Sequence, residues 1–388
     1  MRLSIDSGLR ILGHVIVAAF LAAVIAGHPA ANAEGASAWQ SLPTLPAPTA
    51  GLTAVRMPDD SIVALGGDAT LGQRSRMAIR LDPRHDAWRR LPSAPVDLDT
   101  PGALVLGDHA VFVVAPSFAN GAISAPSQVL ILDPVWGRWL SLPPCPVALL
   151  KPRVLRLTPN TVLAAGGVGN LLGATFNLTT LRWTPFDSPV PNLAGYTLAD
   201  LPGKGAVLLA SVAIDARGNP IPVRRAWLLG PSSSWTQIAR PPVLMDGASA
   251  MALGSTRILF AGGYPLGDDP RLPAPPALLY DLALNQWTIA GSTGSDHRGG
   301  QLVALGNGAA VLVGGHAPTG QPTSSCLMFS QSSWRHAFAL PAPWAGYAAV
   351  STDRGELLLI GGARPSTTGP IAGAAAVLLP FARLSGAA

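Results

Sequence analysis

The chain alternates short apolar runs with short polar turns over most of its length. The clearest example begins at Arg257, where an apolar run ends in Gly262-Gly263, a loop rich in Pro and Asp follows, and a second apolar run precedes Trp287. Apolar runs of about four to eight residues bounded by turn residues are typical of strands that are buried on both faces. The pattern therefore predicts a protein built from many short strands.

The same unit recurs seven times, and a tryptophan marks each copy. Successive tryptophans are 44 to 52 residues apart, at Trp39, Trp88, Trp139, Trp183, Trp235, Trp287 and Trp334. A bulky residue stands seven positions before six of them, at Leu81, Leu132, Phe176, Leu228, Tyr280 and Leu327.

Five units also keep a glycine doublet at the end of an apolar run. These doublets are Gly66-Gly67, Gly166-Gly167, Gly262-Gly263, Gly314-Gly315 and Gly361-Gly362. The second and fourth units have Ala115-Pro116 and Ala210-Ser211 instead. Another apolar run and a short turn precede this run in every unit, so each unit contains four strands, which we call a, b, c and d.

Seven units of four strands predict an all-β, seven-bladed β-propeller, because one blade cannot bury its own faces and blades therefore stack into a ring. The order of doublet, aromatic residue, six residues and Trp resembles the kelch-repeat family. Two units have both aromatic residues at this spacing, Tyr280 to Trp287 and Phe176 to Trp183. The other units have Leu in place of the first aromatic residue, which departs from the kelch pattern. The resemblance covers Ala38 to Leu379 and implies a kelch-type propeller.

The ends of the repeat predict how the ring closes. The seventh unit supplies strands a, b and c between about 346 and 379 and has no Trp after them. The first copy of the repeat is a strand-d phrase, Trp39 to Pro43, without strands a to c before it. We expect this N-terminal strand to complete the last blade.

Residues 1–33 have the features of a signal peptide. Arg2 and Arg10 flank a charged start, Ile11 to Ala26 is nearly all apolar, and Ala31-Asn32-Ala33 has the small side chains that a signal peptidase requires. The apolar run is short for a membrane-spanning helix, which needs about 20 residues. We predict cleavage after Ala33, export to the periplasm or the extracellular space, and a single propeller domain over residues 34–388 without a membrane segment. An uncleaved anchor is the alternative.

Composition restricts the partners. Charged residues make up only 12% of the chain, and the net charge of +5 comes from Arg residues that are mostly scattered singly. A protein that binds nucleic acid concentrates such charge on one element. We therefore expect no nucleic-acid partner, and we expect a monomer whose partner is an unidentified protein or glycan.

No motif in the sequence specifies a catalytic or metal-binding chemistry. The chain has no phosphate-binding loop, no nucleophile elbow and no paired His or Cys motif. We predict no metal and no cofactor. Cys145 and Cys326 fall in the second and sixth units, and we expect them to be too far apart for a disulfide and to be free buried thiols.

Strand order sorts the loops between two faces. Because successive strands are antiparallel, the a-b and c-d turns lie on one face, and the b-c and d-a loops lie on the other, which we call the loop face. The loops of the loop face are long and varied, as is usual for loops that carry binding residues on a rigid scaffold. We predict the binding site on this face, among Asp268, Asp269, Arg271, Asp296, His297, Arg298, His316 and Arg364.

These residue types can do useful chemistry, but a simpler interpretation also exists. Arg can bind carboxylates or sugar hydroxyls, and His and Asp can transfer protons. Alternatively, exposed loops carry charge only because they are solvated. Trp344 lies outside the repeat positions, and it could be a stacking platform for a sugar or peptide or could pack beneath its own loop.

Two functions remain open. The first is a binding module that recognises a protein or glycan outside the cytoplasm. The second is a sugar-active enzyme, because exported kelch-like propellers include sialic acid epimerases (mutarotases), a similarity at the level of the fold. Copper-radical galactose oxidases also share the propeller, but they need a crosslinked Cys-Tyr pair, and neither cysteine here has a plausible partner among the four tyrosines. We exclude that chemistry.

Overall fold

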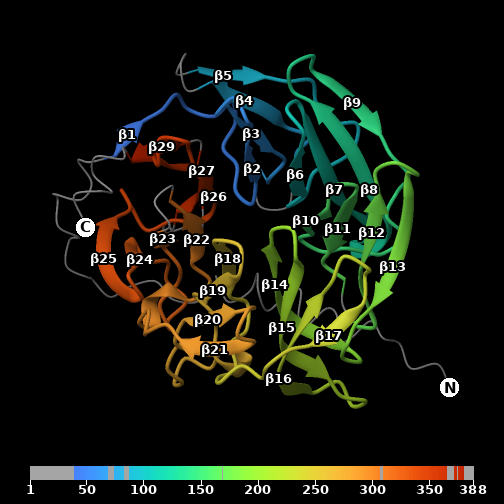
Figure 1. The fold of residues 1–388 in the computed structure, drawn as a ribbon. Helices are drawn as coiled ribbons and strands as arrows, with labels where there is room; N and C mark the ends of the chain where they lie inside the picture. The colour runs from blue at the N-terminus through green and yellow to red at the C-terminus, as the bar shows by residue number, and fades with distance from the viewer. Residues whose placement is uncertain are drawn as a thin grey trace.

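The computed structural model describes residues 39–68, 74–82, 87–167, 169–305, 309–364, 371–373 and 375–379. Seven antiparallel sheets surround a common axis (Figure 1). This arrangement confirms the all-β, seven-bladed propeller with four strands in each blade. The predicted signal peptide at residues 1–33 lies outside the described residues.

The first three blades follow one another along the chain. Blade 1 consists of β2 (Thr53–Arg56), β3 (Ile62–Leu65), β4 (Ala78–Asp82) and β5 (Ala87–Arg90). Blade 2 consists of β6 (Gly102–Leu106), β7 (Ala110–Ala119), β8 (Ala122–Asp133) and β9 (Arg138–Ser141). Blade 3 consists of β10 (Arg153–Thr158), β11 (Thr161–Ala165), β12 (Leu171–Asn177) and β13 (Arg182–Asp187).

The next three blades have the same order. Blade 4 consists of β14 (Leu193–Leu201), β15 (Gly205–Ile214), β16 (Pro220–Leu229) and β17 (Trp235–Gln237). Blade 5 consists of β18 (Ser249–Leu253), β19 (Arg257–Ala261), β20 (Leu278–Asp281) and β21 (Gln286–Ile289). Blade 6 consists of β22 (Gln301–Ala304), β23 (Ala310–Val313), β24 (Ser325–Ser330) and β25 (Ser333–Ala339). Two short 3-10 helices, η1 (Leu266–Asp268) and η2 (Ser295–His297), lie in loops.

Both ends of the chain build blade 7. Its strands are β26 (Ala345–Ser351), β27 (Leu357–Arg364), β29 (Ala376–Leu379) and the N-terminal β1 (Gln40–Ser41), with β28 (Ile371–Ala372) paired beside β27. In the pairing of β1 with β29, Gln40 lies opposite Leu378, and Ser41 lies opposite Val377. The predicted closure of the ring by the N-terminal strand is confirmed.

The core is divided among the seven interfaces between blades. Buried apolar residues of the described chain form seven clusters, and each cluster joins two neighbouring blades. In β3, Ile62 and Ala64 pack toward blade 7, whereas Val63 and Leu65 pack toward blade 2. Because side chains alternate between the two faces of a strand, a strand that is covered on both faces must be apolar at every position. This explains the continuous apolar runs.

The repeat tryptophans join each blade to the preceding one. All seven donate the indole N–H to a backbone carbonyl of that blade over 2.7 to 2.9 Å; the acceptors, in the order of the tryptophans, are Ala339, Pro43, Pro92, Pro143, Asp187, Ala239 and Ala290. Each indole thereby links two blades at the outer edge of the ring, as its regular spacing indicated.

The bulky residue seven positions before a tryptophan lies opposite it in four blades and not in two. Leu81, Leu132, Phe176 and Tyr280 lie opposite the tryptophan that follows them. Trp235, however, lies opposite Leu229 instead of Leu228, and Trp334 lies opposite Phe329 instead of Leu327. The c-d turns are shorter there, and in blade 6 only Gln331 and Ser332, both with positive φ, separate the paired residues Ser330 and Ser333.

The glycine doublets allow a loop to cross the end of strand b. Gly66 and Gly67 have φ of 68° and 90°, and a Cβ on Gly66 would lie 2.1 Å from the carbonyl oxygen of Leu98 in the next d-a loop. Only glycine accommodates this conformation and this contact. In blades 2 and 4, which lack the doublet, strands b and c continue as the long hairpins β7–β8 and β15–β16.

The two cysteines lie in different interfaces, Cys145 between blades 2 and 3 and Cys326 between blades 6 and 7. Both are free and buried, as expected. Burial raises the pKa of the Cys145 thiol to about 11 and that of Cys326 to about 12, so both are protonated and unreactive at neutral pH. Among the described residues, no helix has the length and hydropathy needed to cross a membrane.

Candidate functional site

A group of polar side chains gathers on the loop face where blades 5 and 6 meet. Its members are Asp246, Tyr264, Asp268, Arg298 and His316, and we call it the blade 5–6 cluster. Two pairs of backbone hydrogen bonds extend the blades toward it: Asp246 pairs with Tyr264 in blade 5, and Arg298 pairs with His316 in blade 6. Tyr264 and His316 directly follow the doublets of these blades, so the two blades present equivalent positions side by side.

Arg298 holds the b-c loop of blade 5 in place. Only 1% of this residue is exposed. Its Nη1 donates to Oδ1 of Asp268 over 3.0 Å, and its Nη2 donates to the carbonyl oxygen of Leu272 over 2.7 Å. Nε is buried and has no hydrogen-bond partner among the described residues. The guanidinium therefore ties the loop after Gly263 to the loop that enters blade 6, and it leaves no open fork toward solvent.

Asp268 is the exposed end of this contact. Its side chain is 58% exposed although it pairs with a buried arginine. The residue lies in η1 with φ of 49°, directly after Gly267 with φ of 68°, so the backbone turns sharply there. The carboxylate is thus fixed in position while part of it remains open to solvent.

The environment keeps the neighbouring tyrosine and histidine uncharged at neutral pH. Burial raises the pKa of Tyr264 to about 12, and the negative charge of Asp268 adds to this effect while Arg298 opposes it. Burial lowers the pKa of His316, and Asp268 acts in the opposite direction. The cluster therefore combines a phenol, a neutral imidazole and carboxylates. These groups can bind hydroxyls or transfer a proton.

Blade 4 contributes to the same cluster through Ser211. Its hydroxyl donates to Oδ1 of Asp246 over 2.5 Å and is buried. Asp246 also lies against Gly195 of β14, where a Cβ would be 2.6 Å from Oδ1. Ser211 stands where the fourth unit has lost its glycine doublet, so this departure from the repeat supplies the hydroxyl that orients Asp246.

The side chains of the other predicted site residues lie outside this cluster, although the carbonyl oxygen of Asp269 accepts a hydrogen bond from Nη1 of Arg298 over 3.5 Å. His297 is buried, its Nδ1 lies 2.8 Å from the carbonyl oxygen of Gly314, and burial lowers its pKa. Asp296 is exposed in η2. Arg271 and Asp269 form an exposed ion pair of 2.8 Å, and hydrogen bonds from Arg271 lower the pKa of Asp269 to about 2.

Arg364 lies in blade 7, with its guanidinium carbon 4.6 Å from the centre of the Trp344 ring. Trp344 itself is only 1% exposed, so it packs beneath its own loop and cannot serve as a stacking platform. Of the eight residues predicted from the sequence, the structure thus brings together Asp268, Arg298 and His316. No group of three or more His, Cys, Asp or Glu in the described part of the chain is arranged to hold a metal ion.

Sequence reasoning did not select Tyr264 and Ser211 as site residues. Tyr264 could have been found from its position directly after a glycine doublet, because His316 occupies the same position in the next unit. Ser211 could have been found from the replacement of glycine by a hydroxyl residue in the fourth unit. Both signals depend on aligning the units with one another.

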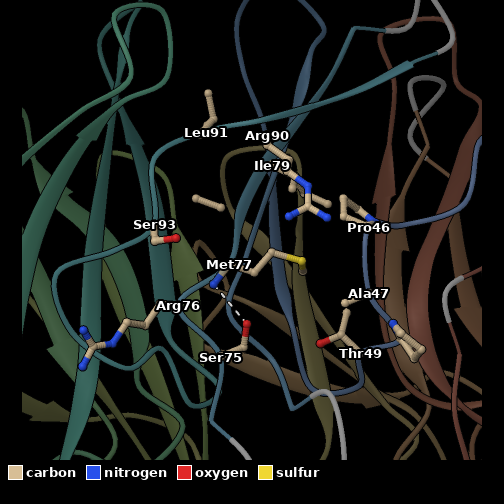
Figure 2. A pocket seen from close by; sticks show the side chains of 12 residues that line it. Pro46, Ala47, Thr49, Ser75, Arg76, Met77, Ile79, Arg90, Leu91 and Ser93 are labelled. Carbon is tan, nitrogen blue, oxygen red and sulfur yellow. Dashed lines mark hydrogen bonds between the residues drawn. The ribbon is translucent and has the colours of Figure 1, made fainter.

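A pocket of about 290 Å³ lies elsewhere, between the segment Pro46–Thr49 and the outer strands of blade 1. Figure 2 shows the guanidinium of Arg90 between Pro46 and the thioether of Met77, whereas the Arg76 side chain points away. Arg76 is paired with Asp97 over 2.8 Å, and the hydroxyl of Ser75 accepts the Met77 N–H over 3.0 Å. This pocket contains none of the predicted site residues.

Comparison with known proteins extends only to the fold. No protein-family model matches the chain, and no curated protein matches it. Among solved structures, the chain is similar to the one titled "Structure of YjhT", with 15% sequence identity and a TM-score of 0.50. The similarity covers 87% of this chain and 96% of that chain. At this identity the similarity shows the propeller fold alone, and the likeness to the kelch family remains a resemblance of sequence pattern.

Proposed function

We propose that the protein is a binding module that recognises a glycan or protein through its loop face, with the blade 5–6 cluster as the contact site. The observation that supports this proposal is the contact between buried Arg298 and exposed Asp268. Taking a guanidinium out of water costs solvation free energy, which its hydrogen-bond partners offset only in part. A buried arginine that fixes a solvent-facing carboxylate is therefore better explained by recognition than by stability.

The remaining members of the cluster suit a ligand with hydroxyl groups. Tyr264 offers a protonated phenol, His316 a neutral imidazole, and Asp246 a carboxylate that Ser211 orients. Rigid strands carry all these loops, which keeps the entropy cost of binding low. The signal-peptide features of residues 1–33 support a location outside the cytoplasm for this recognition.

A second candidate function is a sugar-active enzyme that resembles a sialic acid epimerase. The observation that favours it is the proximity of a neutral imidazole, His316, to the carboxylate of Asp268. Such a pair could remove and return a proton on a bound sugar.

A screen of neutral sugars, acidic sugars and peptidoglycan fragments by thermal shift, together with affinity capture of protein partners, tests the binding proposal. For any ligand found, we expect Asp268→Asn and Tyr264→Phe each to weaken binding by about tenfold or more, because each removes a hydrogen bond to the ligand. Asp296→Asn is the matched control, since Asp296 is exposed on the same face outside the cluster. Equal affinity of wild type and both cluster variants would contradict the proposed site.

Exchange between anomers of a bound sugar, measured by NMR, distinguishes the two functions. Exchange that is accelerated by the wild type and abolished in His316→Gln would establish the enzyme. Binding of a sugar without faster exchange between its anomers would support the binding module.

A further inference from the structure

The seven inner strands carry few charged side chains, and the guanidinium of one of them has no partner among the described residues. The inner strands β2, β6, β10, β14, β18, β22 and β26 surround the axis (Figure 1). Their described residues include four charged side chains, Arg56, Arg153, Arg156 and Asp200. Arg56 pairs with Asp353, and Nη1 of Arg156 donates to the carbonyl oxygen of Pro159 over 2.8 Å. The guanidinium of Arg153 forms no hydrogen bond or ion pair with the described residues.

Arg153 stands at the end of the inner ring that belongs to the loop face. It is the first residue of β10 and lies opposite Ala165, directly before the doublet of blade 3. Its side chain is exposed to solvent, yet the surrounding protein lowers the pKa of the guanidinium. Such a position, near many protein atoms and still open to solvent, is reachable by a ligand approaching along the axis.

Asp200 provides a comparison within the same ring. The Oδ1 of Asp200 is buried and has no hydrogen-bond partner among the described residues, and burial raises the pKa of Asp200 to about 6. Asp200 lies near the far end of β14, next to the a-b turn, so it cannot neutralise Arg153. A carboxyl group can lose its charge by taking up a proton near neutral pH, but a guanidinium cannot. The charge of Arg153 therefore persists at neutral pH and remains available to an anion that approaches from solvent.

We infer that Arg153 anchors a binding site for a small monocarboxylate at the axial end of the loop face. One unpaired positive charge balances one negative charge, and the planar guanidinium matches a carboxylate through two parallel hydrogen bonds. Asp246 and Asp268 on the same face disfavour a dianion such as inorganic phosphate. This inference rests on the proposed binding role of the loop face and adds the chemical class of the ligand.

Two contacts join blade 3, which carries Arg153, to the blade 5–6 cluster by way of blade 4. The Tyr196 hydroxyl of blade 4 donates to the carbonyl oxygen of Gly167 in blade 3 over 3.0 Å, and Asp246 lies against Gly195, the residue before Tyr196. Blades 3, 4 and 5 are thus in contact along one arc of the loop face. A ligand with a carboxylate at one end and hydroxyls along its length fits such an arc.

D-gluconate and D-glucitol are suitable probes, because they have similar size and hydroxyl groups and differ in the carboxylate. Melting temperatures are measured with each probe and with inorganic phosphate, at constant ionic strength, for wild type, Arg153→Gln and Arg156→Gln. Arg156 is the matched control, since it lies on the same strand and has a backbone partner. We expect millimolar gluconate to raise the melting temperature of the wild type and of Arg156→Gln, but not that of Arg153→Gln. Glucitol should have no such effect.

A second measurement does not depend on any ligand. Without a probe, Arg153→Gln should melt at the same temperature as wild type or higher, because the substitution removes a charge without a partner, whereas Arg156→Gln should melt lower because it loses a hydrogen bond. A lower melting temperature for Arg153→Gln would indicate a structural role and overturn the inference. So would a wild type that does not respond to gluconate, or one that responds more strongly to phosphate through Arg153.

The two proposals fail separately. If Asp268→Asn abolishes binding of a glycan or protein while Arg153→Gln leaves every gluconate response unchanged, the blade 5–6 cluster stands and the carboxylate site is wrong. If only Arg153→Gln has an effect, the carboxylate site stands without the cluster.

Discussion

Individual charged residues of this propeller differ in how the protein compensates for their burial. Arg298 is almost completely buried and has three oxygen acceptors, on Asp268, Asp269 and Leu272. Asp200 has a buried oxygen for which the described residues offer no hydrogen-bond partner. Substituting Arg298 breaks contacts that compensate for its burial, so the protein should become less stable. Substituting Asp200 removes a charge whose burial is not compensated, so the protein should become more stable.

Arg298→Met should destabilise the protein. The substitution leaves the carbonyl oxygen of Leu272 without its donor and frees the blade 5 loop, and we expect a loss of about 2 kcal/mol because Asp268 is partly solvated and keeps water as a partner. The free energy of unfolding from urea titration measures this loss. Arg271→Met, in an exposed ion pair, is the control and should be indistinguishable from wild type. Equal stability of all three proteins would show that Arg298 does not hold the loop.

Asp200→Asn should stabilise the protein at neutral pH. The folded-state pKa of about 6 lies above the unfolded value, so above that pH folding must bury a charge that the unfolded chain keeps in water. We expect a gain of about 1 kcal/mol at pH 7.5, reduced by the partial exposure of the group. The gain should fall to a small fraction as the pH drops to about 4, where Asp200 is protonated in the folded state and about half protonated in the unfolded chain.

Urea titrations at both pH values measure this effect. Asp215→Asn is a suitable control, because Asp215 is exposed and hydrogen bonds from Asn219 lower its pKa. It should show no gain at neutral pH. A benefit of Asp200→Asn that is the same at both pH values would contradict the assignment to the charge.

At the scale of the element, the glycine doublet determines how closely another loop can pack against strand b. With the doublet, as in blade 1, the backbone adopts positive φ and the d-a loop packs closely across it. Without the doublet, as in blades 2 and 4, strands b and c extend into hairpins that leave the blade. The sequence revealed where the doublets are missing, but the hairpins themselves depend on pairing between residues on both sides of the turn.

The variants Gly66→Ala and Gly107→Ala distinguish the effect of the close contact with Leu98 from the effect of the positive φ. Both glycines have positive φ, but a Cβ on Gly66 would lie 2.1 Å from the Leu98 carbonyl oxygen, whereas nothing lies within 4 Å of a Cβ on Gly107. We expect Gly107→Ala to cost about 1 kcal/mol for the backbone alone. Gly66→Ala should cost about 3 kcal/mol or more, because backbone atoms must move. Equal losses in thermal unfolding would show that the close contact is unimportant.

At the scale of the whole molecule, closure of the ring combines the two ends of the described chain. β1 supplies strand d of blade 7, Trp39 donates to the carbonyl oxygen of Ala339 in blade 6 over 2.8 Å, and Leu45 packs in the interface between blades 7 and 1. Every blade of a ring contacts two neighbours, so removing one strand weakens the interfaces on both sides.

Deletion of residues 34–45 should therefore lower the melting temperature strongly, since it removes β1, Trp39 and Leu45 together. Deletion of residues 34–38 is the matched control, because it leaves all three in place and should melt like the protein that begins at Glu34. Thermal unfolding followed by circular dichroism measures both variants. An unchanged melting temperature for the longer deletion would contradict the role of β1 in closure.

The sequence by itself determined the seven blades, the four strands in each, the closure by the N-terminal strand and the burial of both cysteines. These features repeat along the chain or follow from counting copies, and local residue patterns are sufficient to specify strands and turns. Even here, the tertiary structure decided the partners of Trp235 and Trp334, because a c-d turn shortened by one or two residues changes the register without changing the apolar pattern.

Only the tertiary structure decided which polar residues meet. Arg298 and Asp268 are 30 residues apart, and Ser211 and Asp246 are 35 apart, on neighbouring blades. No periodicity of the sequence encodes such contacts, since they depend on how loops from different blades pack against one another. The sequence identified the face that carries the charged loops. Packing between blades then placed Tyr264 and His316 beside Asp268 and left Arg271, Asp296 and Arg364 apart.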